Sequence, residues 1–143
     1  MRHRLSQQVV FRDIDYFQHA NNAAYSTWSE TARLDYMREV CGVEDLALMN
    51  IVLGTLRIRF VSPALYRERV EIRTQVSWLG HKSFAMEHEL RGSDGRLVAE
   101  IDTVQVCFDH ATGETVPLPA EWRRSMEEFE GRPLDRPHGG ATV

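Results

Sequence analysis

The chain has 143 residues, which is enough for one domain with a hydrophobic core and too few for two. Hydrophobic residues make up 43% of it and charged residues 27%, values that exclude a disordered or fibrous chain. The formal net charge of −4 gives no global electrostatic case for nucleic acid or for an anionic membrane. Because no apolar run resembles a membrane span or a secretory signal, we expect a cytoplasmic protein with no membrane partner.

The two cysteines, Cys41 and Cys107, lie far apart in the sequence. Their positions match neither a CxxC redox motif nor the ligand spacing of a zinc site. Two cysteines also make no disulfide framework, so we expect buried thiols. The histidines at positions 81, 88 and 110 show no metal-ligand spacing, and we expect neither a metal nor another cofactor.

The first half of the chain contains one strand pattern, one irregular segment and one long helix. Residues 7–11 alternate in hydrophobicity and predict a short strand, whereas residues 12–22 have no period and predict a loop. Asn21 or Asn22 can cap a helix, and Gly42 can end it about twenty residues later. Apolar residues occur on several sides of this helix, so we expect other elements to cover several sides.

The second half is rich in strands. Alternation with a period of two predicts strands over residues 56–60, 70–78, 84–91 and 97–108, and Ser93-Asp94-Gly95 predicts a hairpin turn between the last two. A short amphipathic helix is expected over residues 121–129. We therefore predict an α+β fold in which a curved antiparallel sheet wraps a long central helix. The domain is expected to occupy residues 1–130, with a mobile tail over residues 131–143.

Polar residues that can support chemistry cluster just before and within the first turn of the long helix. They are Asp13, Asp15, His19, Asn21, Asn22 and Tyr25. A helix N-terminus presents unpaired N–H groups and favours negative charge. A carboxylate beside it can attack or deprotonate while the N–H groups stabilise an oxyanion. This arrangement indicates acyl transfer.

Three runs carry a family resemblance: VFRDID at 10–15, HANNAAY at 19–25 and ETAR at 30–33. Together they resemble the signature of hotdog-fold thioesterases related to 4-hydroxybenzoyl-CoA thioesterase. That signature reads D-x-D-x-x-G-H-V-N-N-x-x-Y, followed by E-x-A-R on the central helix. The order of elements, a turn at Gly80 to Ser83 and the Asp94-Gly95 hairpin also fit, so the resemblance covers about residues 9–119.

The resemblance implies a hotdog fold whose subunits join sheets edge to edge, with each active site at the subunit boundary. Asp15 would then be the catalytic carboxylate, acting as nucleophile or as general base toward water. The amides at residues 21–23 would polarise the thioester carbonyl, and Asn22 stands where some relatives carry a polar catalytic partner. The residues expected to contact substrate are His19, Asn21, Ala23 and Tyr25.

Two positions depart from the family pattern. Gln18 replaces the glycine before His19, and Ala20 replaces the valine after it. The glycine lets a backbone N–H approach the carbonyl closely, so Gln18 raises a question about the local backbone. Another branch of hotdog thioesterases uses a helical Glu with a Thr one turn later. Here Glu30 is followed at that distance by Leu34, so this alternative fits poorly.

Several of these residues also have purely structural interpretations. Asp13 can brace the loop, Asp15 can cap it, and His19 can hold it by hydrogen bonding without carrying a proton. Tyr25 can line the acyl pocket or belong to the core. Glu30 and Arg33 are expected to form an ion pair, inside the fold or at a subunit contact, where pairing lowers the cost of burial.

Coenzyme A would bring phosphates, and the chain has a locally basic stretch that contains Arg57, Arg59, Arg67, Arg69 and Arg73. Arginine binds phosphate through two parallel hydrogen bonds. We expect Arg57 and Arg59 to be candidates for contact with the phosphates of coenzyme A. Lys82 and Ser83, at the turn before the strand predicted over residues 84–91, are further candidates. Alternating arginines on a strand are also typical of a solvated face.

The leading prediction is an acyl-CoA thioesterase that acts as a homodimer or homotetramer without a cofactor. An acyl-carrier-protein thioesterase remains open, since the arginines could dock a protein carrier. A non-catalytic module that binds acyl thioesters also remains open because of Gln18. A hydratase of the same fold is disfavoured, because the chain lacks the D-x-x-x-N-P-x-H motif.

Overall fold

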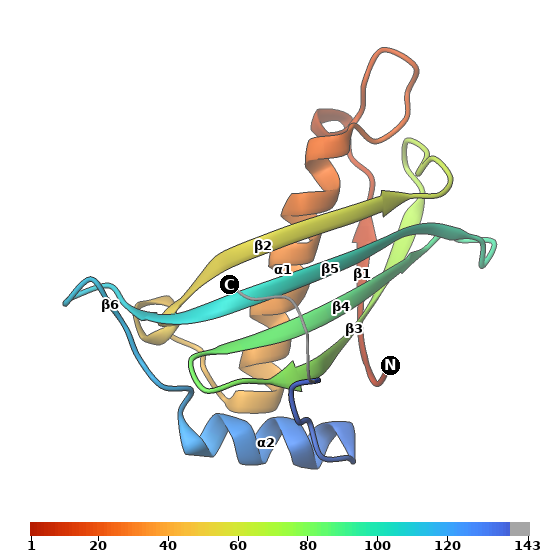
Figure 1. Cartoon of the computed structure of the whole chain (residues 1–143). Helices are drawn as coiled ribbons and strands as arrows, with labels where there is room; N and C mark the ends of the chain where they lie inside the picture. Colours follow the sequence, from red (N-terminus) through yellow and green to blue (C-terminus); the bar gives the residue numbers. More distant parts are fainter. Residues whose placement is uncertain (138–143) are drawn as a thin grey trace.

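The structure, a computed structural model, describes residues 1–137. One antiparallel sheet contains the strands in the order β1-β3-β4-β5-β2, with the short β6 paired to β5 (Figure 1). The strands are β1 (His3–Gln8), β2 (Ile51–Phe60), β3 (Arg69–Leu79), β4 (Ser83–Arg91), β5 (Leu97–Asp109) and β6 (Glu114–Thr115). The helices are α1 (Asn22–Cys41) and α2 (Ala120–Glu130). A curled antiparallel sheet with two helices matches the predicted α+β class.

Helix α1 begins and ends where the sequence predicts. The side chain of Asn21 accepts a hydrogen bond from the N–H of Ala24, and Gly42 ends the helix with a left-handed φ of 70°. The helix lies against one face of the curled sheet, behind β5 and β2 in Figure 1. Its buried residues include Trp28, Ala32 and Tyr36, which follow one another at four-residue intervals.

The four strands predicted in the second half are present, and burial alternates along them. On β3, the alternate residues Val70, Ile72, Thr74 and Val76 are fully buried, while Glu71, Arg73 and Gln75 between them are partly exposed. The hairpin predicted at Ser93-Asp94-Gly95 joins β4 to β5, and Gly95 adopts a φ of 86° there. The prediction that β2 starts at residue 56 is wrong, because its pairing with β5 begins at Ile51.

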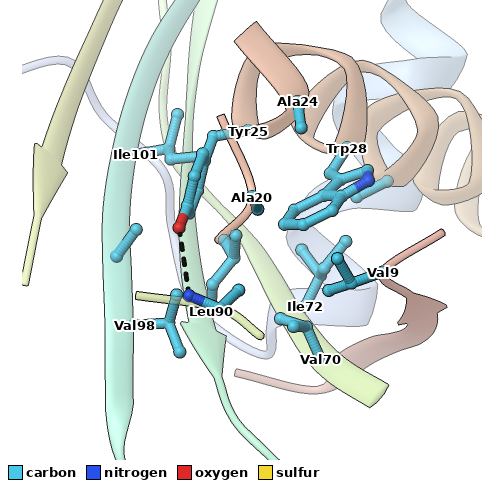
Figure 2. Close-up of a cluster of buried hydrophobic side chains, with 13 residues drawn as sticks. Val9, Ala20, Ala24, Tyr25, Trp28, Val70, Ile72, Leu90, Val98 and Ile101 are labelled. Atoms are coloured by element: carbon cyan, nitrogen blue, oxygen red, sulfur yellow. Dashed lines mark hydrogen bonds between the residues drawn. The ribbon is translucent and has the colours of Figure 1, made fainter. Parts of the chain in front are cut away.

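The core has two parts along α1. The first packs Tyr25 and Trp28 against the sheet close to the start of the helix (Figure 2). The second packs Tyr36 and Met37 against Trp122 of α2, toward the end of the helix. The short helix predicted over residues 121–129 is confirmed as α2, which lies across one end of the sheet (Figure 1).

The first strand lies earlier than predicted. Instead of residues 7–11, β1 occupies His3–Gln8, and Phe11–Asp13 forms a 3-10 helix. The chain leaves the sheet edge at Val9, whose N–H donates to the carbonyl of Glu68 at 2.8 Å. The carboxylate of Asp13 then accepts a hydrogen bond from the N–H of Val10, which favours the helical turn over continued pairing.

The segment after α2 corrects the predicted tail. Leu134 is only 1% exposed, and its carbonyl accepts a hydrogen bond of 2.7 Å from the N–H of Leu79. Asp135 forms a parallel bridge with Leu79. The packed chain therefore continues beyond residue 130, because an apolar side chain in this segment fills the second part of the core. The rest of the predicted tail, residues 138–143, lies outside the described residues.

Within residues 1–137, neither helix is both long and apolar enough to cross a membrane.

Candidate active site

A closed loop connects the 3-10 helix to α1 and carries Asp15. Ile14 and Ala20 pair as an antiparallel bridge at its base, and the N–H of Asp15 donates to the carbonyl of His19 at 2.8 Å. The loop is anchored further by a hydrogen bond of 2.7 Å from the N–H of Asn21 to the carbonyl of Asp13. In Figure 1 this loop projects beyond the sheet at the N-terminal end of α1. Asp15 is thus held by backbone contacts at an exposed position.

The two carboxylate oxygens of Asp15 have different surroundings. Oδ1 accepts hydrogen bonds from the N–H of Phe17 at 2.9 Å and the N–H of His19 at 3.3 Å. Oδ2 has no partner among residues 1–137, and the side chain is exposed. One oxygen therefore fixes the orientation of the carboxylate, and the other is free to meet a substrate or a water molecule.

The backbone at Gln18 has the conformation that the family glycine would adopt at this position. Its φ is +63°, in the left-handed region that glycine adopts without strain. Its N–H donates to the carbonyl of Asp15 at 3.0 Å, and its carbonyl accepts from the N–H of Tyr66 at 3.1 Å. The loop therefore keeps a backbone conformation that suits glycine, and the strain of a side chain is offset by these two bonds.

The first turn of α1 presents unpaired backbone donors. The side chain of Asn21 satisfies the N–H of Ala24, but the N–H groups of Asn22 and Ala23 have no acceptor among the described residues. Both of these residues are exposed. A cavity of about 250 Å³ lies at this end of the helix and is lined by Arg12, Asp13, Asn21, Ala23, Ala24 and Thr27. Such donors can hold an oxyanion.

The remaining predicted site residues divide into structural and exposed groups. Asp13 braces the loop, as the structural interpretation predicted, through its bond to the N–H of Val10 at 2.9 Å. His19 contributes its backbone to the loop and to a bridge with Leu65. Asn21 is the helix cap, while the side chain of Asn22 is exposed on the first turn of α1.

Tyr25 belongs to the core of the described chain. It is 3% exposed and packs against Trp28 with the two rings tilted and their centroids 5.2 Å apart. Its hydroxyl accepts a hydrogen bond from the N–H of Ala64 at 3.4 Å, drawn as the dashed line in Figure 2. Burial raises the pKa of Tyr25, so the hydroxyl stays neutral. Within one chain its side chain therefore does not face the cavity at the helix end.

A second loop, residues 61–68, supports the Asp15 loop, and the sequence reasoning missed it. Its Ala64 carbonyl accepts from the N–H of Ala20 at 2.9 Å, and its Leu65 pairs with His19. Glu68 anchors this second loop by accepting two hydrogen bonds of 2.6 Å from Arg96. The arginine lies well over twenty residues later in the chain, so no local pattern indicates this pair.

Exposed aromatic rings next to Asp15 are a further feature that sequence reasoning missed. Tyr16 is 96% exposed and Phe17 is 74% exposed, and their rings meet edge to face. The sequence signal that could have indicated this feature is the pair of adjacent aromatic residues in an otherwise polar loop. Exposed rings of this size favour contact with a ligand or another protein chain.

The structure places the four predicted phosphate residues in two separate regions of the sheet. Arg57 and Arg59 lie on β2, and Arg59 forms an ion pair with Glu100 across the sheet. Lys82 and Ser83 lie at the turn between β3 and β4, close to β6 and far from the Asp15 loop in Figure 1. Arg12, which was not singled out, lines the cavity at the start of α1.

The predicted ion pair between Glu30 and Arg33 is absent from residues 1–137. Both residues line one cavity beside β2, yet no contact within 4.0 Å joins their charged atoms. Arg33 is only 5% exposed, and its Nη1 is buried without a hydrogen-bond partner in the described chain. Burial lowers the pKa of Arg33, while the charge of Glu30 acts in the opposite direction.

Both cysteines are free thiols. Cys107 is buried, as predicted, whereas Cys41 is only partly buried, and both line a cavity of about 440 Å³ between the end of α1 and α2. Burial raises the pKa of Cys41 to about 12 and that of Cys107 to about 11. Among residues 1–137, a single group has the residue types and spacing of a metal site: His3, Asp35 and Glu39. Its His3 Nε2 already bonds to Asp35 at 2.8 Å, at the end of β1 opposite the Asp15 loop (Figure 1).

Comparison with known proteins shows the family. The family model of the thioesterase-like superfamily matches residues 9–126. The chain belongs to this superfamily. The match confirms the resemblance that the three sequence runs indicate, and it includes both the Asp15 loop and the first turn of α1.

Individual members of the thioesterase-like superfamily support the same assignment. The long-chain acyl-CoA thioesterase FadM of Escherichia coli is 28% identical over 119 residues, covering 81% of this chain and 90% of its own length. The structure of a thioesterase from Thermus thermophilus, complexed with coenzyme A and Zn, is 30% identical with a TM-score of 0.84, covering 94% of this chain and all of its own. A probable thioesterase of Escherichia coli, YbaW, is 26% identical with a TM-score of 0.75, covering 89% and 98%.

Proposed function

We propose that the protein is an acyl-CoA thioesterase that hydrolyses its substrate to a free acid and coenzyme A. The observation that carries the proposal is Asp15, whose Oδ1 is fixed by two backbone N–H groups while Oδ2 is free. It precedes a helix whose first N–H groups, those of Asn22 and Ala23, have no acceptor in the described chain. Membership of a superfamily of thioesterases supports the choice of a thioester as the reacting group.

In the proposed reaction the thioester carbonyl lies at the start of α1, the central helix of the hotdog. The N–H groups of Asn22 and Ala23 stabilise the negative charge that develops on the carbonyl oxygen. Asp15 either attacks the carbonyl carbon or removes a proton from the attacking water, and the thiolate of coenzyme A leaves. The side chain of Asn22 is then placed to orient the substrate or the water.

Coenzyme A is favoured over acyl carrier protein as the acyl carrier. Docking of an acidic carrier would need free arginines, but Arg59 pairs with Glu100, and Arg73 bonds to Glu71 at 2.5 Å. These pairs neutralise two of the five arginines in the basic stretch that suggested a carrier. Two named relatives point the same way, one as an acyl-CoA thioesterase and one as a complex with coenzyme A.

We also propose that the active protein is a homodimer joined through β2. Within residues 1–137 this ten-residue strand pairs with β5 alone, so its other edge is free in that part of the chain. Leu53, Leu56 and Phe60 on it are 39–46% exposed, an unusual amount for large apolar side chains in a sheet. A second copy of β2 would pair with the free edge and cover these side chains.

Replacing Asp15 by Asn tests the catalytic proposal. Asn keeps the oxygen that accepts the N–H bonds but cannot act as base or nucleophile, so the release of free thiol from a panel of acyl-CoA esters should fall at least about a hundredfold. The panel begins with long-chain esters, because the relative FadM is a long-chain acyl-CoA thioesterase. Matched esters of acyl carrier protein show which carrier is used.

Asp109→Asn is a matched control for this experiment. Asp109 accepts a hydrogen bond from the N–H two residues later, as Asp15 does, but lies at the opposite end of the sheet. It should keep normal activity. A folded Asp15→Asn protein with undiminished activity would remove Asp15 from the mechanism. Stoichiometric binding of acyl-CoA without thiol release by the native protein would instead establish a binding module.

A further inference from the structure

Arg33 is a buried cation that lacks a hydrogen-bond or ion-pair partner in the described part of its own chain. It projects from the middle of α1, is 5% exposed, and has a buried Nη1 with no hydrogen-bond partner among residues 1–137. Leaving a guanidinium group buried without a carboxylate is costly, because it loses water and gains no compensating charge. The fold therefore leaves a place for an anion beside Arg33.

The cavity next to Arg33 opens at the free edge of the sheet. It measures about 270 Å³ and is lined on one side by Glu30, Arg33 and Leu34 of α1. On the other side it is lined by Ile51, Val52 and Leu53, at the start of β2. Since β2 is the last strand of the sheet, a second chain that pairs with β2 would also cover this cavity.

Glu30 supplies the complementary charge. Its side chain is exposed and has no hydrogen bond or ion pair within the described chain. Glu30 lies eight residues after the first residue of α1, and Arg33 lies eight residues before the last. In a two-fold dimer residue i meets residue j and j meets i. Two antiparallel copies of α1 centred on each other therefore bring Glu30 of each to Arg33 of the other.

We propose that Arg33 of each protomer forms an ion pair with Glu30 of the second copy across the dimer interface. The inference rests on the dimer proposed above and adds the polar contact that fixes its register. The two symmetric pairs lie beside the apolar side chains of β2, where exclusion of water strengthens them. A charged pair at this position disfavours any other alignment of the two chains, because another alignment would separate Arg33 from its carboxylate.

Two charge-reversed proteins test this contact. Glu30→Arg places two arginines opposite each other in a homodimer, and Arg33→Glu places two glutamates opposite each other. Each variant alone should dimerise at least about a hundredfold more weakly than the native chain. An equimolar mixture restores both attractive pairs, so it should form a one-to-one heterodimer. Sedimentation velocity on differently tagged chains measures both results.

The mixture separates a contact between chains from a contact within one chain, because mixing cannot repair an internal pair. Should Arg33→Glu not fold alone, co-expression with Glu30→Arg replaces mixing, and recovery of soluble heterodimer is then the expected result. Glu128→Arg, an exposed reversal on α2, should leave the native dimer intact.

The proposal is overturned by any of three outcomes. Variants that dimerise as tightly as the native chain would assign Arg33 to another anion, such as a carboxylate on the substrate. Variants that weaken the dimer without rescue in the mixture would exclude the cross-chain pair. A native chain that is monomeric would exclude the dimer itself, whereas thiol release measured separately with Asp15→Asn reports on the thioesterase proposal.

Discussion

Glu68 and Arg96 are joined by two parallel hydrogen bonds of 2.6 Å, one to each carboxylate oxygen. The same carboxylate accepts hydrogen bonds from the N–H of Leu65 and the N–H of Ser93. One buried group thus ties the loop at residues 61–68 to the hairpin between β4 and β5. Because that loop pairs with the Asp15 loop, the contact supports the candidate site from a distance.

Glu68→Gln should destabilise the protein and lower its activity. The hydrogen bonds to Arg96 hold the pKa of Glu68 down at about 2, so the pair stabilises the fold above the ordinary carboxylate pKa near 4.5. This stabilisation is lost as pH falls from 4.5 toward 2, because the folded state then has to take up a proton. We expect a loss of about 2 kcal/mol in urea unfolding at pH 7 and a much smaller loss near pH 2. An equal loss at both pH values would contradict the assignment.

Gln18→Gly should stabilise the loop. A side chain at a φ of +63° costs about 1 kcal/mol, which glycine avoids, although glycine gives back part of the gain through a more flexible unfolded chain. We expect a small rise in the thermal midpoint and no loss of thioesterase activity. Gln18→Val is the opposite control, since a β-branched residue in this conformation should lower the midpoint by several degrees. A lower midpoint for the glycine variant would mean that the Gln18 side chain itself stabilises the loop.

His88 should make the fold sensitive to mild acid. It is 1% exposed, its Nδ1 lies 2.9 Å from the Thr74 hydroxyl, and burial lowers its pKa to about 3. In the unfolded chain His88 takes up a proton near pH 6.5, but in the folded chain it does not. Its contribution to the free energy of unfolding is therefore nearly constant above pH 6.5 and becomes unfavourable below it. Between pH 6.5 and pH 5 the loss should be about 2 kcal/mol. Unfolding of His88→Gln should lack this slope, and exposed His81→Gln should retain it.

The two thiols should react slowly in the native protein. With pKa values of about 12 for Cys41 and about 11 for Cys107, little thiolate is present at pH 8. We expect native thiols to react with a disulfide reagent at least about a hundredfold more slowly than thiols in denaturant. The variants Cys41→Ser and Cys107→Ser show which cysteine gives rise to each phase of the reaction with the reagent. Fast reaction of either native thiol would show that the cavity shared by the two opens readily.

The long helix and the four strands could be predicted because their signals are local. Asn21 and Gly42 mark the ends of α1 by their own backbone preferences, and alternation along β3 reflects one buried face. The start of β1 was misplaced because Val9, although fully buried, lies just after the strand and packs into the core from there. Burial of a side chain and pairing of a backbone are separate properties, and hydrophobic alternation reports only the first.

The candidate site was only partly predictable for a related reason. Asp15 and the cap at Asn21 lie in one short run, so the sequence indicates them together. The support from Glu68 and Arg96 depends on a contact between two loops, and the packing of Leu134 on β3 depends on the path of the chain after α2. The missing partner of Arg33 could be recognised only from its burial, which no pattern of charges in the sequence reports.

The free edge of β2 also affects how readily a single protomer aggregates. Ten residues without proline, with Leu53, Leu56 and Phe60 exposed, offer a template on which any extended chain can add a strand. If the protein pairs as proposed, a newly made protomer would be most prone to aggregate before it pairs. In the proposed dimer, pairing at β2 would remove that template, so resistance to aggregation would be a property of the pair rather than of the single chain.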